Sequence, residues 1–338
     1  MTYEVTLIPG DGIGPEITDA TVKVLEATGV RFSWDVQLGG IAAVAAKGTP
    51  IPDETLDSIR TRRIALKGPL TTPIGSGFRS INVALRREFE LFANLRPAKT
   101  IMPGRYDHID IVLVRENLEG FYTGLEHWIA LGDDPRAAGV STGVTTRHGC
   151  ERILRYAFEY AVRQGRKKVT IVHKANILKM VSGLFLEVGR VIAEEYRGRV
   201  ESNEMIVDNC AMQIVLRPEQ FDVIVTTNLF GDILSDEISG LVGGLGLAPG
   251  ANIGTTASIF EAVHGSAPDI AGKGIANPAA QMLAGAMMLD HLGELDAGRR
   301  LRQALYDTIV TQGIRTKDLG GHASTQQFGE QVAARSRA

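Results

Sequence analysis

A short segment of the chain gathers side chains that could bind an anion with several charges. The stretch GPLTTPIGSGFRSINVALRREFELFANLRP, residues 68–97, contains a hydroxyl, an amide and two arginines: Ser80, Asn82, Arg86 and Arg96. Asn82 and Arg86 lie four residues apart, which predicts a helix over about residues 80–89 with a polar face. Ser80 then lies at the helix N-terminus, where free backbone N–H groups favour an anion. In the simpler interpretation, Ser80 only caps the helix and Arg86 is a solvated surface charge.

Arginines at the ends of strands favour the binding interpretation. Arg96 follows the apolar run LFANL, and Arg115 ends another apolar run in IDIVLVREN. Binding sites of α/β proteins collect at strand ends, and guanidinium groups bind carboxylates with two parallel hydrogen bonds. Three arginines therefore indicate a substrate with several carboxylates.

A second group is acidic and could bind a divalent cation. In NLFGDILSDEISG, Asp232 and Asp236 lie four residues apart on a predicted helix, so their carboxylates share a face. We expect the core to receive the apolar residues of this helix: Ile233, Leu234 and Ile238. Asp208, in IVDNCAMQ, is a possible third ligand from a strand end, and an all-oxygen ligand set suits Mg²⁺ or Mn²⁺. Acids that complement a helix dipole would give the same spacing, which leaves both interpretations open.

Alternating strand and helix patterns must position these groups. Short β-branched runs such as VTLIP and KKVTIVHK are each followed by a helical pattern, which predicts an α/β fold with largely parallel strands. Between residues 122 and 146, YTGLEHWIA and GVSTGVTT flank the polar LGDDPRAA and predict an antiparallel arm that could pair with a second subunit. Crossings at residues 97–104 and 240–254 predict that the chain leaves one lobe, builds a second and returns.

The stretch GDGIGPEI, residues 10–17, resembles a dinucleotide-binding turn but departs from it. Pro15 stands where G-x-G-x-x-G requires its third glycine, and only Asp35 offers an acid at about the right distance. We therefore interpret this stretch as a tight turn between a strand and a helix.

Composition excludes several classes of protein. With 338 residues, 44% hydrophobic residues and no long apolar run, the chain is expected to be a soluble globular protein of two lobes. A net charge of −3 without a basic stripe argues against nucleic acid or a membrane as partner. No signal peptide is recognisable, and Cys150 and Cys210 lack disulfide or zinc-ligand spacing, so we expect ordinary buried thiols and a cytoplasmic location.

Several motifs together carry a family resemblance over essentially the whole chain. In order they are IPGDGIGPE, the stretch of residues 68–97, VRENLEGFYTG, NLFGDILSDEISG, EAVHGSAPDIAGKGIANP and a terminal DLGG. This set resembles the isocitrate/isopropylmalate dehydrogenase family of metal-dependent β-decarboxylating dehydrogenases, and is most similar to its NAD-dependent isocitrate dehydrogenases.

The resemblance implies a fold and an assembly. The expected fold is a two-lobed α/β fold that is not a Rossmann fold, with the antiparallel arm serving dimerisation. A discontinuous large domain, residues 1–98 plus 250–338, is expected to bind the coenzyme. A small domain, residues 99–249, is expected to carry the dimer interface and the metal and catalytic residues. The implied partner is a second copy of the chain, in a homodimer with shared active sites.

The resemblance also implies a substrate. Ser80 and Asn82 resemble the pattern that contacts the distal carboxylate of isocitrate, whereas an isopropylmalate enzyme is expected to be apolar there. Homoisocitrate is harder to exclude because one methylene gives only about 1–3 kcal/mol of discrimination. The expected reaction is therefore oxidative decarboxylation of isocitrate, a tricarboxylate, to 2-oxoglutarate in the tricarboxylic acid cycle. The implied substrate-binding set is Ser80, Asn82, Arg86, Arg96, Arg115, Tyr122 and Lys174.

Metal and catalytic roles follow from the same resemblance. Asp232 and Asp236, with Asp208 of the partner subunit, are implied to hold Mg²⁺ or Mn²⁺. Lys174 of the partner subunit is implied as the base, acting through water or Asp208, and Tyr122 as the acid that protonates the substrate carbon after CO₂ leaves. The alternative from another class is a regulatory subunit that keeps the fold without catalysis, although none of the matched positions is lost.

Coenzyme contacts are implied mainly in the segment HGSAPDIAGKGIANP. The implied set is Thr72, Asn176, Glu261, His264, Gly265, Ser266, Ala267, Asp269, Ile270 and Asn277. Asp269 and Ile270 occupy the pair at which NADP-dependent relatives typically carry a lysine and a tyrosine. A carboxylate there accepts hydrogen bonds from the ribose hydroxyls of NAD and repels the 2′-phosphate of NADP, so NAD is the expected coenzyme.

Overall fold

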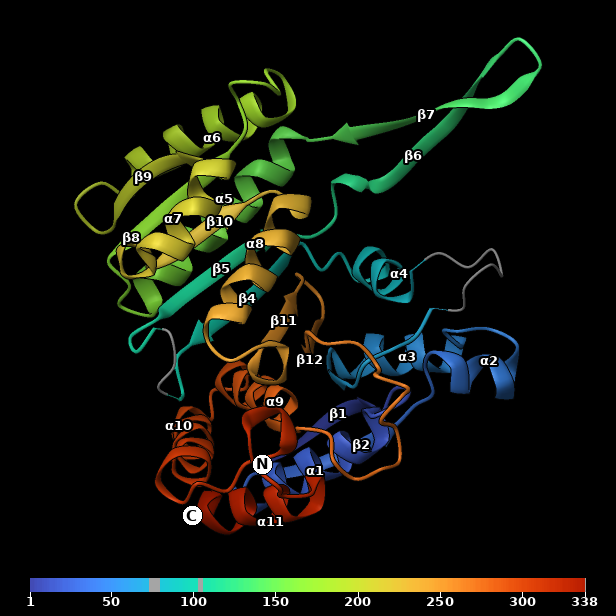
Figure 1. Cartoon of the computed structure of the whole chain (residues 1–338), viewed down its shortest axis with the longest axis vertical. Helices are drawn as coiled ribbons and strands as arrows, with labels where there is room; N and C mark the ends of the chain where they lie inside the picture. Colours follow the sequence, from blue (N-terminus) through green and yellow to red (C-terminus); the bar gives the residue numbers. More distant parts are fainter. Residues whose placement is uncertain (73–79, 103–105, 338) are drawn as a thin grey trace. The chain divides into compact units, whose positions relative to one another are not determined.

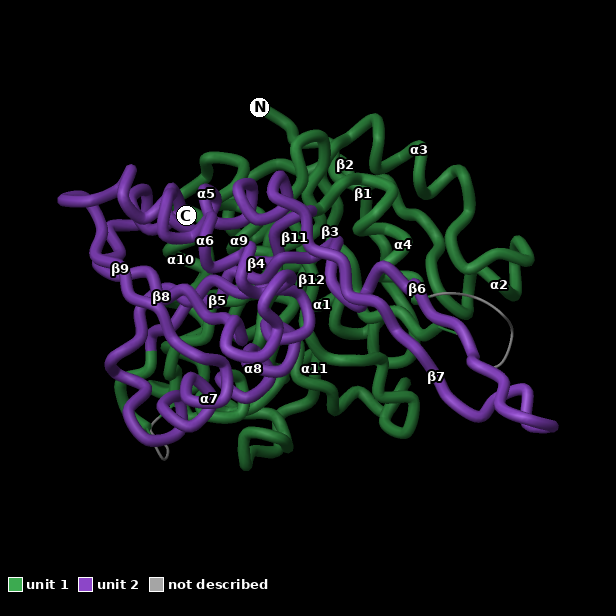
Figure 2. Tube along the Cα trace, turned by 90° about the horizontal axis from the view of Figure 1, so that it is seen from above, with its two compact units in different colours: residues 1–91, 96–109, 239–338 green, residues 92–95, 110–238 purple. Residues whose placement is uncertain are grey.

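The computed structural model describes residues 1–72, 80–102 and 106–337 of the chain. The chain divides into two compact units, coloured separately in Figure 2: unit 1 comprises Met1–Leu91, Arg96–Ile109 and Ser239–Ala338, and unit 2 comprises Phe92–Leu95 and Asp110–Ile238. The chain thus leaves unit 1, builds unit 2 and returns. The domain limits at 98/99 and 249/250 stay predictions, and the units group residues 99–109 and 239–249 with the two chain ends. Residues 73–79 of the 68–97 stretch lie outside the described residues.

The strands of unit 1 follow the order β2-β1-β3-β12-β11. Their bounds are β1 (Thr2–Ile8), β2 (Arg31–Val36), β3 (Ile64–Lys67), β11 (Pro249–Ile253) and β12 (Ser258–Ala262). Parallel pairs join β1 to β2 and β3, and β3 to β12, while β11 is antiparallel to β12. The strands β3 and β12 are almost entirely buried, as parallel strands covered on both faces usually are.

Some helices of unit 1 pack on these strands, and others pack on neighbouring helices (Figure 1). Their bounds are α1 (Gly14–Ala27), α2 (Ile41–Lys47), α3 (Asp53–Arg62), α4 (Ile81–Glu88), α9 (Ala279–His291), α10 (Leu295–Tyr306) and α11 (Thr325–Ser336). α9 is buried almost all round because it packs on β11 and β12 and also against α1 and α10. Its Gln281 donates to Lys67 O at 3.1 Å and accepts from the N–H of Ala262 at 3.1 Å, which joins the ends of β3 and β12.

Unit 2 is built on parallel strands in the order β5-β10-β8-β9. Its elements are β5 (Asp110–Glu116), α5 (Arg147–Arg163), β8 (Lys168–His173), α6 (Val181–Glu195), β9 (Glu201–Ile206), α7 (Val207–Leu216) and β10 (Val223–Thr226). Two further elements, β4 (Ala93–Lys99) and α8 (Asn228–Leu241), contain residues of both units. Because the strands are parallel, Arg115, Lys174 and Asp208 all lie at or just after carboxyl ends on one edge of unit 2.

The predicted antiparallel arm is confirmed. It is the hairpin of β6 (Gly120–Leu131) and β7 (Asp134–Val144), which extends away from the parallel strands of unit 2 (Figure 1). The segment LGDDPRAA was predicted to form the whole connection between the two strands. The turn is shorter than that, because Leu131 already pairs with Asp134 and the strands continue to the tip of the hairpin. Trp128 and Leu131 expose 60% and 64% of their surface, so the hairpin presents apolar side chains to its surroundings.

Two smaller predictions are also confirmed. In the stretch GDGIGPEI, residues 10–13 form a tight turn after β1 and residues 14–17 begin α1. Asp35 accepts hydrogen bonds from Ser58 at 2.6 Å and from Gln37 at 2.9 Å. Cys150 and Cys210 are buried free thiols, and burial raises the pKa of each to about 12. No helix among the described residues has the length and apolar character needed to cross a membrane.

Candidate active site

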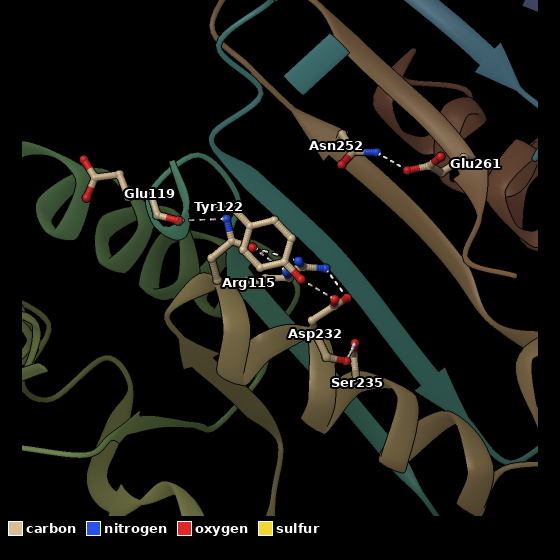
Figure 3. Close-up of polar contacts among 8 residues, drawn as sticks. Arg115, Glu119, Tyr122, Asp232, Ser235, Asn252 and Glu261 are labelled. Carbon is tan, nitrogen blue, oxygen red and sulfur yellow. Dashed lines mark hydrogen bonds and ion pairs between the residues drawn. The ribbon is translucent and has the colours of Figure 1, made fainter. Parts of the chain in front are cut away.

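Arg115 is a buried cation held by two side chains of α8. Its side chain is 1% exposed near the end of β5. Nε and Nη2 donate to Asn228 Oδ1 at 3.0 and 2.7 Å, and Nη1 pairs with Asp232 (Figure 3). A buried guanidinium needs such partners because an unpaired buried charge is strongly destabilising. These bonds use one N–H of Nη1 and one of Nη2, so each nitrogen keeps a second N–H that a carboxylate could accept.

Tyr122 binds the same aspartate. Its Oη donates to Asp232 Oδ2 at 2.6 Å, and the guanidinium of Arg115 lies 5.1 Å from the centre of the tyrosine ring. One carboxylate therefore receives a cation on one oxygen and a phenol on the other, and Figure 3 shows both side chains directed at it. Asp232 keeps 38% of its side chain exposed, so a ligand can still reach it.

Position 231 must be glycine because α8 passes so close to the side chain of Arg115 that a Cβ would not fit. A Cβ at this position would lie 2.6 Å from Arg115 Cγ and 2.7 Å from Arg115 Cβ. We expect Gly231→Ala to displace the guanidinium and to lower the free energy of unfolding by about 1–3 kcal/mol in urea titrations. Gly240→Ala, in the same helix, meets nothing within 4 Å and should be neutral or stabilising by up to about 1 kcal/mol. Equal losses of stability in the two variants would contradict this account of Gly231.

The acid pair on α8 is arranged mostly as predicted. Asp232 is partly exposed and Asp236 exposed, while Leu234 and Ile238 are each 1% exposed. The prediction for Ile233 is wrong, because this side chain is 60% exposed. At about 100° per residue, Ile233 falls outside the stripe that Leu234 and Ile238 form.

The carboxylates of this pair suit Mg²⁺ or Mn²⁺, which prefer oxygen ligands. Among the described residues, however, no three His, Cys, Asp or Glu side chains converge on a possible metal position within one chain. Asp208 therefore does not join Asp232 and Asp236, although all three belong to unit 2. The contribution of Asp208 from a partner subunit stays a prediction.

Lys174 and Asp208 form a separate pair. Lys174 follows β8 and Asp208 follows β9, and these neighbouring parallel strands end at the same edge. Lys174 Nζ pairs with Asp208, and this hydrogen bond lowers the pKa of the aspartate. The backbone N–H of Lys174 donates to Ser182 Oγ at 2.7 Å, which fixes the turn after β8. Since Asp208 exposes 69% of its side chain, the pair lies on the surface of unit 2.

The helix predicted over residues 80–89 is α4, with Ser80 as its N-cap and Phe89 as its C-cap. The capping role considered for Ser80 is wrong, since its exposed side chain makes no capping bond. Instead, the N–H of Ile81 donates to Thr72 Oγ1 at 3.3 Å. The hydroxyl of Ser80 is therefore not needed to begin the helix.

The other anion-binding candidates of unit 1 are buried or half-buried. Arg86 is 8% exposed, which excludes the solvated surface charge of the simpler interpretation, and Arg96 is half-buried in β4. Asn82 Oδ1 is buried and has no hydrogen-bond partner among the described residues. A buried polar atom without a partner is unusual in a folded protein, and a bound ligand is one way to satisfy it.

Glu261 belongs to a buried cluster that sequence analysis did not foresee. Its Oε2 pairs with Lys67 Nζ at 2.5 Å. Its Oε1 accepts from Asn252 Nδ2 at 2.6 Å, a contact drawn in Figure 3. Burial raises the pKa of Glu261, but the charges of Lys67 and Arg86 outweigh burial and hold it at about 2. Both oxygens therefore bind the chain itself, at the ends of β3, β11 and β12.

The 264–278 loop carries most of the coenzyme candidates and is tied down within unit 1. Ser266 and Thr71 share a hydrogen bond of 2.6 Å between their hydroxyls, and Asn277 Nδ2 donates to Asp318 Oδ2 at 2.9 Å. Burial lowers the pKa of His264, whose Nε2 is buried without a partner among the described residues.

The remaining coenzyme candidates differ in burial. Ala267 and Ile270 pack against a small core of Ile13, Ile17 and Ala276. Gly265 and Asp269 are exposed in the 264–278 loop. Asn176 is exposed in the turn after β8, in unit 2.

Asn228 is the functional candidate that sequence analysis missed most clearly. It is 1% exposed, binds Arg115 through Oδ1, and donates from Nδ2 to Glu119 O at 3.2 Å. Its position two residues after the end of the strand VIVT, within NLFGD, was the available signal, because polar residues at carboxyl ends of parallel strands collect at sites.

Comparison with known proteins shows the family. The family described as isocitrate/isopropylmalate dehydrogenase matches residues 4–332. This chain belongs to that family. A crystal structure of isocitrate dehydrogenase from Methylococcus capsulatus is 58% identical, with a TM-score of 0.95 over 99% of this chain and 100% of that chain.

Two curated relatives show how closely the sequence follows this dehydrogenase family. The isocitrate/homoisocitrate dehydrogenase of Thermus thermophilus is 47% identical over 98% of each chain. Subunit 2 of the mitochondrial NAD isocitrate dehydrogenase of Schizosaccharomyces pombe is 45% identical over 98% of this chain and 87% of its own. The family resemblance, its closeness to the NAD isocitrate dehydrogenases and the fold class are therefore confirmed.

Proposed function

We propose that this chain oxidises isocitrate to 2-oxoglutarate and CO₂, reduces NAD, and requires Mg²⁺ or Mn²⁺. The observation that carries the proposal is the cluster on Asp232, whose carboxylate binds both a buried arginine and a tyrosine phenol. The cluster combines a cation for carboxylates, an acid of the type that binds hard metal ions, and a proton donor. Oxidative decarboxylation of a polycarboxylate uses these three kinds of group together.

The substrate carboxylates are bound by three arginines. Arg115 offers the second N–H of Nη1 and of Nη2, and Arg86 and Arg96 serve further carboxylates. Ser80 and Asn82 contact the distal carboxylate, a role supported by the exposed hydroxyl of Ser80 and the unpartnered Oδ1 of Asn82.

Two groups of the chain handle protons. Lys174 of the partner subunit takes the proton of the substrate hydroxyl, directly or through water or Asp208. Tyr122 Oη holds its proton toward Asp232 in the ligand-free chain and turns to deliver it to the substrate carbon after CO₂ has left. Asp232 and Asp236, with Asp208 of the partner subunit, would hold a divalent metal ion, which would supply Lewis-acid polarisation of the substrate oxygens.

The coenzyme site proposed is the 264–278 loop with Thr72, Glu261 and Asn176. NAD held there would supply the hydride acceptor. Asp269 is exposed and so can meet the adenine ribose, where its carboxylate favours NAD over NADP. Glu261 acts there by holding Lys67 and Asn252, since both its oxygens are already bound.

The active assembly proposed is a cytoplasmic homodimer with shared sites. The exposed apolar side chains of the β6–β7 hairpin and the absence of a three-acid site in the described part of one chain both support it. The relative from Schizosaccharomyces pombe is named as a subunit, so a non-catalytic role within a larger assembly is the alternative that a test must separate.

The purified chain alone should reduce NAD with isocitrate and Mn²⁺. We expect kcat/KM with NAD to exceed that with NADP by at least about a hundredfold, since a like charge meets the 2′-phosphate. Homoisocitrate and 3-isopropylmalate, assayed alongside, should be used less well, homoisocitrate by about tenfold or more. Absence of activity with every substrate would favour the non-catalytic alternative, and a higher kcat/KM for homoisocitrate or NADP would replace the corresponding part of the proposal.

A further inference from the structure

The turn between β1 and α1 has no part in the proposed reaction, although its sequence GDGIGPE is distinctive. Gly10 and Gly12 have φ angles of 85° and 59°, in the left-handed region that glycine tolerates. A Cβ at Gly12 would lie 2.0 Å from Ser266 O. The backbone of the 264–278 loop, packed directly on this turn, therefore accounts for the glycine.

Asp11 lies in this turn and binds three backbone N–H groups. The residue is 7% exposed. Its Oδ2 accepts from the N–H of Thr71 at 2.7 Å and of Ile41 at 3.1 Å, and its Oδ1 accepts from the N–H of Ala42 at 3.2 Å. The N–H of Asp11 donates in turn to Pro69 O at 2.7 Å. Hydrogen bonds to a carboxylate are stronger than neutral ones, so this side chain firmly joins the 68–72 segment and the start of α2 to the turn.

The elements joined by Asp11 also hold the 264–278 loop. The N–H of Ile13 donates to Ser266 O at 2.9 Å, and the hydroxyl of Thr71 bonds that of Ser266. Thr72, the next residue, receives the first N–H of α4. Asp11 therefore binds the segment of Thr72 directly, through the N–H of Thr71, and reaches Ser266 through Thr71 or through Ile13, two residues further along the chain. All of these residues belong to unit 1.

We propose that Asp11 is a positioning residue for the coenzyme, which sets the spacing between the Thr71–Thr72 segment and Ser266 without touching the coenzyme itself. The inference rests on the proposed function, because it takes the 264–278 loop as the NAD site. Asparagine at this position has one carbonyl oxygen and one NH₂ group, so at least one of the three backbone N–H groups would face a donor.

Asp11→Asn should raise the KM for NAD by about tenfold or more, while kcat and the KM for isocitrate stay within about twofold. Hydrogen exchange of the Ile13 and Thr71 amides should quicken by about tenfold in the ligand-free protein. The matched control is Asp35→Asn, an aspartate of unit 1 whose partners are Ser58, Gln37 and Arg62 and which binds no residue of the 264–278 loop. It should lower stability without changing the KM for NAD.

A second variant covers the case in which Asp11→Asn does not fold. Thr71→Val keeps the N–H that Asp11 binds and removes only the hydroxyl bond to Ser266, so the KM for NAD should rise by about threefold. The proposal is overturned if Asp11→Asn and Asp35→Asn raise the KM for NAD equally, or if Thr71→Val leaves it unchanged. If the wild-type protein does not use NAD, the proposed function fails on its own. The exchange rates then still decide, because unchanged rates at Ile13 and Thr71 would mean that Asp11 does not hold the two segments.

Discussion

Asp232→Asn should remove nearly all turnover and weaken Mn²⁺ binding, and the chain should remain folded. The amide lacks the negative charge that a divalent cation requires, and loss of Lewis-acid stabilisation worth several kcal/mol corresponds to a decrease in kcat of about a thousandfold or more. Arg115 keeps Asn228 as a partner, so the free energy of unfolding should fall by only about 1–2 kcal/mol. Mn²⁺ titration by calorimetry, with steady-state rates across a Mn²⁺ series, measures both effects.

Asp222→Asn is the matched control for this variant. Asp222 also belongs to unit 2 and pairs with an arginine, since its Oδ1 lies 2.9 Å from Arg166 Nη1. It precedes β10, at the amino end of the strand, whereas Asp232 follows the carboxyl end. The control should lose comparable stability and keep its Mn²⁺ affinity. Unchanged activity of Asp232→Asn at limiting Mn²⁺ would remove Asp232 from the metal site.

Spacing along one element was enough to predict much of the candidate site. Asn82 and Arg86 both lie in α4, and Asp232 and Asp236 both lie in α8. Because residues four apart on a helix share a face, the spacing alone predicted that each pair would lie on one face. The hairpin could be predicted because its strands are neighbours in sequence. The overall family could be recognised because several separate motifs occur in one order.

Contacts between distant elements could not be read from spacing. Arg115 and Asn228 are 113 residues apart, and they meet only because β5 pairs with β10. The sequence identifies each as a polar residue at a strand end but does not say which strands are neighbours. Lys67 and Glu261 meet for the same reason, through the pairing of β3 with β12. The role of Asp11 was hidden because its partners are backbone N–H groups, which carry no sequence signal.

Two inactive variants, Lys174→Met and Tyr122→Phe, should restore activity to each other when unfolded together and refolded as a mixture. Each alone should lose about a hundredfold or more of kcat, as expected when a general base or acid is removed. If Lys174 serves the site of its partner, a mixed dimer contains one site with both native residues and one with neither. Random pairing makes about half of the dimers mixed, so about a quarter of the wild-type activity should return.

A different pair of variants gives the control for this experiment. Lys174 and Asp208 form one ion pair on the surface of unit 2 and are proposed to enter the same neighbouring site. In a mixed dimer of Lys174→Met with Asp208→Asn, each site receives one damaged residue from its partner, so no activity should return. Restoration in the first mixture and not in the second therefore requires that Lys174 and Tyr122 meet across the dimer. If neither mixture recovers although mixed dimers are shown to form, each chain completes its own site, and the Lys174–Asp208 pair must be assigned another role.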